Sequence, residues 1–162
     1  MQISHPKKQS YDLKVNGNTH LVESYPETPI LYILRNQLSL YGPKYGCGLG
    51  QCGACMIMLN GHLAMSCLIS VEAIGSREIT TLAGLVEEDG TLHPVQQAFI
   101  DEQAAQCGYC TNGMILSAVA LLQIDSNPDQ LAIRHAMQNN LCRCGSQSRV
   151  MRAIHRCANP LE

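Results

Sequence analysis

The sequence has no excess of positive charge and no apolar run long enough to cross a bilayer. Its 11 Lys and Arg are offset by 13 Asp and Glu, giving a formal net charge of −2 over 162 residues. This balance provides neither the basic stripe that binds nucleic acid nor a polybasic segment that anchors a chain to lipid. Every apolar run is far shorter than the roughly 20 residues of a membrane span. We therefore expect no nucleic-acid partner and no direct membrane insertion.

Signals for secretion and for flavin binding are also missing. The first residues contain no apolar segment typical of a signal peptide, and no Gly-rich βαβ motif is present. The chain has 9 cysteines, an odd number, and most stand in close pairs along the sequence. A secreted disulfide framework is thus disfavoured, and ligation of metal or of an iron–sulfur cluster in a reducing compartment is favoured. We expect a cytoplasmic protein, with any flavin on a partner.

The segment 44–55, KYGCGLGQCGAC, organises the first half of the chain. Together with a cysteine twelve residues later, its cysteines have the spacing with which plant-type ferredoxins bind a [2Fe–2S] cluster. The glycines between them predict a tight loop that aims backbone N–H groups at the sulfurs. The predicted ligands are Cys47, Cys52, Cys55 and Cys67, and the loop glycines are Gly46, Gly48, Gly50 and Gly53.

A hairpin is predicted to bring the fourth of these cysteines to the others. The dipeptide Asn60-Gly61 divides an apolar run and favours a two-residue turn. If Leu59 pairs with His62, then Cys55 pairs with Ser66. Cys67 then lies beside Cys55.

The rest of the first half predicts a small mixed sheet covered by a helix. Alternating residues indicate strands at 11–15, 20–23 and 78–82, in addition to the hairpin. Between them, Thr28 is expected to cap a helix with Pro29 at its first position, and Gly42-Pro43 to end it. We expect a β-grasp, ferredoxin-like domain over residues 1–84, with a polar, disordered lead or partner-binding arm at 1–9.

From about residue 85 the apolar pattern becomes helical, so the fold class is α+β with a second domain over 85–162. After a short turn at 83–85, helices are expected to begin at Pro94, Thr111, Asn127-Pro128 and Ser148. The inward positions of the third include Leu131 and Ile133. We expect these helices to form a four-helix bundle.

Four more cysteines lie in two connections of this expected bundle. One pair joins the first and second helices and the other joins the third and fourth, and in an antiparallel bundle these connections share one end. Four thiolates are therefore expected to meet there: Cys107, Cys110, Cys142 and Cys144. From spacing alone, a [2Fe–2S] cluster and a structural zinc both remain open for this set. Cys157 lies outside both sets and is expected to be a buried thiol.

With these eight cysteines in this order, the sequence resembles the iron–sulfur small subunits of the molybdenum hydroxylases, the xanthine dehydrogenase and aldehyde oxidoreductase family. The resemblance covers residues 11–157 and includes QCGYC at 106–110 and NLCRCG at 140–145. Segments 28–35 and 93–100 are similar in particular to the small subunits of isoquinoline and nicotinate dehydrogenases. Relatives usually have Pro at the position of Asn112, and Thr-Tyr at the position of Ser146-Gln147.

The resemblance implies an electron-transfer subunit without catalytic residues of its own. A large subunit would use a molybdenum–pterin cofactor to insert oxygen from water into a C–H bond of an N-heterocycle or aldehyde. Two [2Fe–2S] clusters on this chain would pass the electrons singly to an acceptor, a flavin subunit or a cytochrome. The cluster on the second set of cysteines would lie nearer the pterin. Gln106 and Cys144 match positions that contact the pterin in relatives.

Two other functions remain as alternatives. One is a free-standing ferredoxin-type carrier with two clusters; the helical half argues against it, because a simple carrier needs no second domain. The other is a zinc-stabilised interaction module without a redox role. The plant-type cysteine loop argues against this module.

Overall fold

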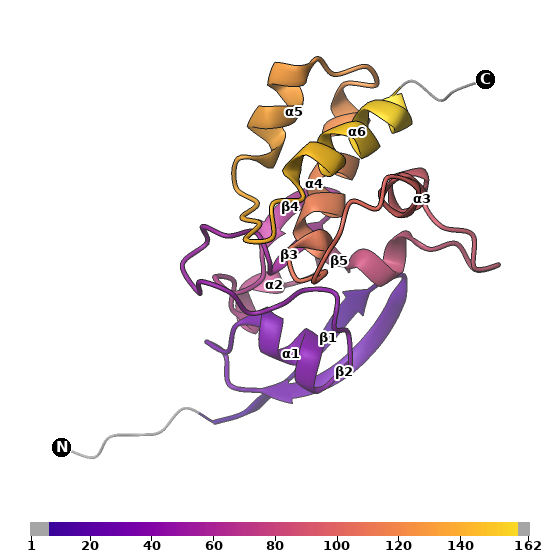
Figure 1. Cartoon of the computed structure of the whole chain (residues 1–162). Coiled ribbons are helices and arrows are strands. Elements are labelled where there is room, and N and C mark those ends of the chain that lie inside the picture. Colours follow the sequence, from indigo (N-terminus) through magenta and orange to yellow (C-terminus); the bar gives the residue numbers. More distant parts are fainter. Residues whose placement is uncertain (1–6, 159–162) are drawn as a thin grey trace.

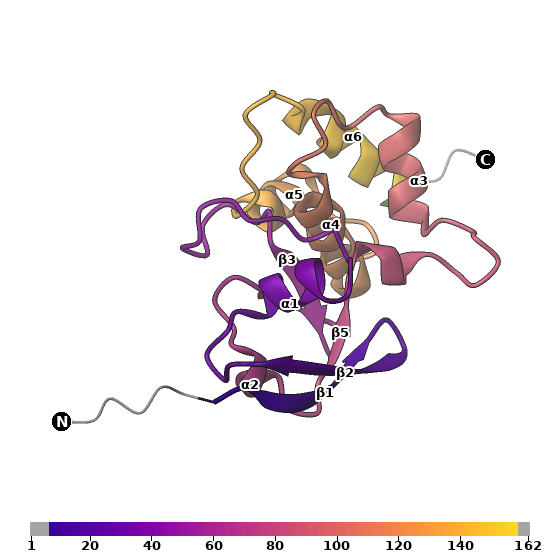
Figure 2. The ribbon, with the colours of Figure 1, turned by 90° about the horizontal axis from the view of Figure 1, so that it is seen from below.

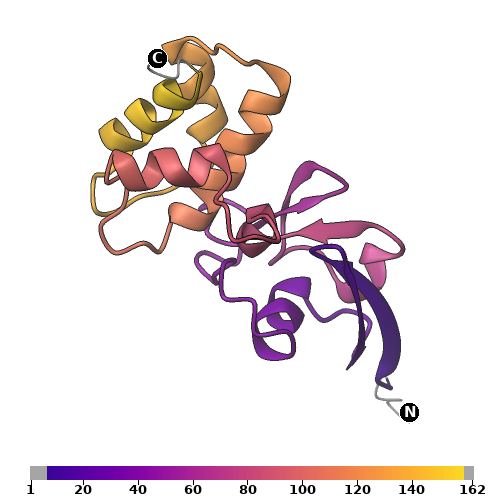
Figure 3. The ribbon, with the colours of Figure 1, turned by 90° about the vertical axis from the view of Figure 1, so that its right-hand side faces the viewer.

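The structure is a computed structural model that describes residues 7–158. Most of the polar arm expected at 1–9 lies outside the described residues. A sheet lobe and a helical lobe are visible in Figure 1 and, from the side, in Figure 3. The two lobes meet where helix α4 (Thr111–Ile124) packs against strands β3 (Met56–Leu59) and β4 (His62–Met65). This junction is where the two groups of cysteines come together.

The first lobe is a five-stranded mixed sheet with strand order β2-β1-β5-β3-β4. Strands β1 (Gln9–Val15) and β2 (Asn18–Ser24) form an antiparallel hairpin, and β5 (Glu78–Thr80) runs parallel to β1. Helix α1 (Ile30–Asn36) packs its apolar residues into the same core as the sheet. The expected α+β class with a ferredoxin-like first half is confirmed.

The limits of α1 differ from the prediction. Pro29, rather than Thr28, occupies the N-cap position, and no side chain caps the helix. The carbonyl of Thr28 instead accepts a hydrogen bond of 2.8 Å from the N–H of Val71, so tertiary backbone contacts fix the start of the helix. The helix also ends at Asn36, well before Gly42-Pro43, because Ser39 turns the chain with φ of 55°.

Helix α2 (Val71–Ile74) was not predicted. Its single turn of 4 residues is too short to show an apolar period. Ser70 caps it by accepting a hydrogen bond from the N–H of Ala73.

The helical lobe follows a short 3₁₀ turn, η1 (Leu82–Leu85), which lies where the sequence predicts a turn. Its other helices are α3 (Pro94–Asp101), α5 (Gln130–Met137) and α6 (Gln147–Ala158). Figure 2 shows α4 passing between β3 and the other helices, so α4 belongs to the bundle and to the lobe junction at once. No helix within residues 7–158 has the length and apolar character needed to cross a membrane.

The third helix of the bundle begins later than predicted. Asp129 caps α5 through its carboxylate, which accepts the N–H of Ala132 at 2.7 Å, so the helix starts at Gln130 rather than at Asn127-Pro128. Ile133 is fully buried as expected. Leu131 was expected to face inward and is 61% exposed, which is a wrong prediction.

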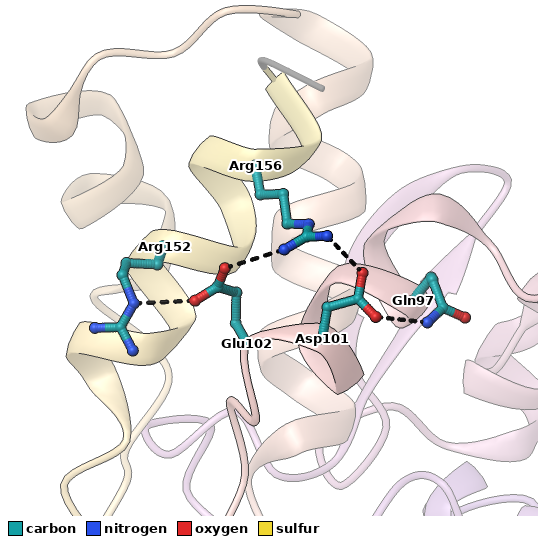
Figure 4. A network of polar contacts seen from close by, with 5 residues as sticks. All are labelled: Gln97, Asp101, Glu102, Arg152 and Arg156. Carbon is teal, nitrogen blue, oxygen red and sulfur yellow. Dashed lines mark hydrogen bonds and ion pairs between the residues drawn. The ribbon is translucent and has the colours of Figure 1, made fainter. Parts of the chain in front are cut away.

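The outer helices α3 and α6 are joined by an ion-pair network at the surface, drawn in Figure 4. Arg152 contacts Glu102 at 3.0 Å, and Arg156 reaches both Glu102 at 3.5 Å and Asp101 at 3.2 Å. Exposed pairs of this kind contribute about 0–1 kcal/mol each. The apolar core shared by α3 and α6 therefore provides most of the stability, and the network adds polar contacts between the two helices.

Candidate iron–sulfur centres

The hairpin β3–β4 brings the first set of cysteines, here called the first quartet (Cys47, Cys52, Cys55 and Cys67), to one place. Leu59 pairs with His62, as the turn predicts. Beyond the strand ends, the N–H and the hydroxyl of Ser66 donate to the carbonyl of Cys55 at 3.3 and 2.6 Å. The sulfurs of Cys55 and Cys67 then lie 3.3 Å apart. The predicted register and its consequence are both observed.

Backbone N–H groups of the glycine-rich loop point at the sulfurs. The N–H groups of Leu49 and Gln51 each lie 3.3 Å from the sulfur of Cys47, and the N–H of Cys47 lies 3.4 Å from that of Cys52. The N–H groups of Leu49 and Gln51, that of Leu49 foremost, lower the pKa of Cys47 to about 7. Burial has the opposite effect at Cys55 and raises the pKa of that thiol to about 12.

The loop glycines serve two different purposes. Gly48, Gly50 and Gly53 have positive φ, as a tightly wrapped loop requires. Gly46 was expected to do the same, but its φ lies outside the left-handed range. A Cβ on Gly46 would lie 2.6 Å from the sulfur of Cys52, so this position needs the absence of a side chain.

The second set of cysteines, here called the second quartet (Cys107, Cys110, Cys142 and Cys144), gathers from the α3–α4 and α5–α6 connections. The thiol of Cys107 interacts with that of Cys144, and the thiol of Cys110 with that of Cys142. Burial raises the pKa of Cys110 to about 12. At Cys142 burial is the largest single effect and acts upward, but hydrogen bonds from the hydroxyl and N–H of Ser146, the thiol of Cys110 and the N–H of Cys144 together outweigh it and lower the pKa to about 7. The Ser146 oxygen lies 3.2 Å from the Cys142 sulfur.

All eight thiols therefore stand in pairs. Cys47 interacts with Cys52 and Cys55 with Cys67, as do the two pairs of the second quartet. Among residues 7–158, no group of three or more His, Cys, Asp or Glu is placed to hold a single metal ion. A [2Fe–2S] cluster takes two protein ligands on each iron, and a pair of thiols supplies that number. The donor set fits two-iron clusters.

Cysteines of both quartets line a common cavity. This cavity has a volume of about 470 Å³ and is lined by Cys47, Cys52, Cys107, Cys110 and Cys142 among others. Cysteine loops that lie far apart in the sequence are thus adjacent in space. Cys157 lies apart from both quartets, and its thiol is 3.4 Å from the carbonyl of Pro94.

Gln106 and Cys144, the expected pterin contacts, lie together at the rim of the helical lobe. The side-chain amide of Gln106 donates to the carbonyl of Cys144 at 3.0 Å. Gln106 and the neighbouring Arg143 are both exposed. A partner surface therefore has access to this edge of the second quartet.

Two buried polar residues near the cysteines were not identified from the sequence as part of a site. Asn112 is fully buried at the lobe junction, and Ser146 is 2% exposed beside Cys142. Both stand at positions where the sequence departs from the pattern of the resembling family. That departure is the sequence signal by which they could have been found.

A ferredoxin-like sheet with one quartet, followed by a helical bundle with another, defines an iron–sulfur protein with two centres. Models of known families match both parts: a "2Fe-2S iron-sulfur cluster binding domain" matches residues 13–82, and a "[2Fe-2S] binding domain" matches residues 81–155.

Relatives agree with these matches. The nicotinate dehydrogenase of Pseudomonas putida has a subunit that is 54% identical over 90% of this chain and 92% of its own length. The alpha subunit of isoquinoline 1-oxidoreductase from Brevundimonas diminuta is 44% identical over 89% of this chain and 94% of its own. The chain belongs to the iron–sulfur small subunits of the molybdenum hydroxylase family, which confirms the electron-transfer role.

Solved structures show the same architecture. Quinoline 2-oxidoreductase from Pseudomonas putida 86 matches with a TM-score of 0.88 and 31% identity, covering 94% of this chain and 93% of that chain. The aldehyde oxidoreductase of Desulfovibrio desulfuricans matches with a TM-score of 0.85 and 37% identity. The match covers 94% of this chain but 17% of that enzyme, in which the same unit is one part of a longer chain.

Proposed function

We propose that the first and second quartets each bind one [2Fe–2S] cluster and that the chain conducts electrons from a large molybdenum–pterin subunit to an outer acceptor. The observation that carries this assignment is the arrangement of the eight thiols in four pairs, with cysteines of both quartets lining one cavity. The clusters supply one-electron chemistry without making or breaking a bond in this chain. The reaction served is the water-dependent hydroxylation of an N-heterocycle or an aldehyde, the substrate classes named in the relatives.

The chain's own residues prepare the sites for iron. Each pair of the second quartet joins a thiol of lowered pKa, Cys107 or Cys142, with one of raised pKa, Cys144 or Cys110. Because iron binds the thiolate form, loading of the cluster would release the protons held by the thiols of raised pKa.

The exposed rim supports the proposed order of the two clusters. Gln106 and Cys144 would contact the pterin, which places the second quartet on the donor side and the first quartet on the acceptor side. A flavin subunit or a cytochrome is the proposed acceptor. The cytoplasmic location and the domain boundary between residues 84 and 85 remain predictions.

Loss of single ligands tests the assignment in the co-expressed complex. Cys55→Ser is expected to remove one paramagnetic signal of the reduced protein and about half of the iron, and Cys110→Ser to remove the other signal. Cys157→Ser is the matched control and should retain both. An unchanged spectrum in Cys55→Ser or Cys110→Ser contradicts the ligand sets. Bound zinc in place of iron supports the interaction module.

Copurification separates the two redox functions. When the chain is purified from its host under native conditions, a large molybdenum-containing subunit is expected to accompany it. A chain that carries both clusters and purifies without any partner would instead be a free-standing carrier.

A further inference from the structure

The lobe junction contains a buried amide that joins the two cysteine loops. Asn112 is 0% exposed and stands two residues after Cys110, in the first turn of α4. Its side-chain Nδ2 donates to the carbonyl of Met56 at 2.8 Å and lies 3.4 Å from the carbonyl of Ala54. These two carbonyls flank Cys55. One side chain thus connects a neighbour of the second quartet to both sides of a first-quartet cysteine.

The sheet explains why the carbonyl of Met56 needs a donor. The carbonyl of Cys55 points toward β4, where Ser66 donates to it, so those of Ala54 and Met56 point to the opposite edge of β3. On that edge β5 pairs only with Met58 and Leu59, and it ends at Thr80. The carbonyl of Ala54 accepts from the N–H of Lys44 at 2.8 Å, so Asn112 supplies at the carbonyl of Met56 the donor that a longer β5 would have supplied.

The orientation of the amide is fixed by its surroundings. Only the amino group of Asn112 can face two carbonyl oxygens, since the reverse orientation would bring three acceptors together. The Oδ1 atom packs against Gly42, where a Cβ would lie 3.0 Å away, and it accepts no hydrogen bond within the described residues. A buried acceptor without a hydrogen bond costs free energy, so the contacts made by the amino group of Asn112 must offset that cost.

Other contacts close the same junction without placing a side-chain donor at the carbonyls that flank Cys55. The N–H of Leu141 donates to the carbonyl of Cys52 at 3.0 Å, and the hydroxyl of Tyr109 donates to the carbonyl of Tyr45. Ser117 accepts from Asn140 at 2.8 Å and contacts the sulfur of Met56 at 3.2 Å. Among the buried side chains that the structure describes at the junction, only that of Asn112 bonds to the peptide groups on either side of Cys55.

We propose that Asn112 is a positioning residue: it fixes the loop of the second quartet to that of the first and so holds constant the separation across which one electron passes between the two clusters. This inference rests on the proposed function. A Pro at this position suits the first turn of a helix but has no donor, so chains with Pro must satisfy the carbonyl at the Met56 position in another way.

The test compares Asn112→Leu with Ser117→Ala in the cluster-loaded full chain. Both remove a buried hydrogen bond at the junction, but only the first removes the donor beside Cys55. The readout is the magnetic interaction between the two reduced clusters in electron paramagnetic resonance, which falls steeply with their separation. In Asn112→Leu we expect the split lines to broaden or the splitting to become smaller. In Ser117→Ala we expect the splitting to stay unchanged.

Asn112→Pro is the second variant, in case the leucine impairs folding or iron loading. It fits the start of α4, so it should load both clusters and show the same altered splitting. An unchanged splitting in a fully loaded Asn112 variant overturns the proposal and leaves the residue a purely structural role. If the unmodified chain shows one cluster or none, the proposed function fails instead.

Discussion

Replacing Gly113 by Ala is predicted to destabilise the protein, although the same change in an ordinary helix would stabilise it. Gly113 lies within α4, where Ala gains about 1 kcal/mol over Gly from helix propensity. Its Cβ, however, would lie 2.2 Å from the carbonyl oxygen of Gly53 and 2.7 Å from Oδ1 of Asn140. The first of these is a backbone atom that cannot rotate away. Overpacking a junction of this kind costs about 1–3 kcal/mol or more.

Because the overlap is with a backbone atom, the cost lies in the upper part of this range, about 2–3 kcal/mol. After the gain of about 1 kcal/mol, the net loss for Gly113→Ala is about 1–2 kcal/mol, which corresponds to a fall of about 2–8 °C in the unfolding midpoint. The assay is thermal unfolding of the cluster-loaded chain, followed by circular dichroism and visible absorbance. Gln123→Ala, at an exposed position of the same helix, is the control and should change the midpoint little. A midpoint that rises in Gly113→Ala would refute the close approach of α4 to the cysteine loop.

Three further predictions concern other parts of the chain. In the iron-free protein, Cys47 should react with iodoacetamide near pH 7 far faster than Cys55, because its pKa is lowered to about 7 while that of Cys55 is raised to about 12; equal labelling by mass spectrometry would contradict this. Asp129→Ala should cost about 1 kcal/mol in urea unfolding, since the cap of α5 is lost, and no change would mean that the cap is unimportant. Glu102→Gln should cost less than about 1 kcal/mol, an effect that shrinks in high salt; a larger, salt-independent loss would contradict a surface role.

Local signals made the first quartet predictable from the sequence. The Asn60-Gly61 turn fixes the register of the β3–β4 hairpin, and that register alone brings Cys67 to Cys55. The convergence of the four thiols of the second quartet was predictable from the order of the helices, because the connections at one end of a bundle are neighbours. Both conclusions need only patterns within short stretches of chain.

Contacts between distant segments could not be predicted in the same way. The start of α1 is fixed by a backbone bond from Val71, whereas Thr28 satisfied every local rule for a cap. The need for Gly46 arises from the sulfur of Cys52, which only the folded loop places beside it. Asn112 is significant because β5 stops at Thr80, and no sequence pattern near residue 112 reports where another strand ends.

The measurement that most directly tests the two-cluster relay is the content of iron and acid-labile sulfide per chain, combined with electron paramagnetic resonance after dithionite reduction of anaerobically purified protein. Two [2Fe–2S] clusters predict about four irons, about four sulfides and two distinct signals. About two irons, a single signal and bound zinc would retain one cluster and contradict the relay between the two quartets.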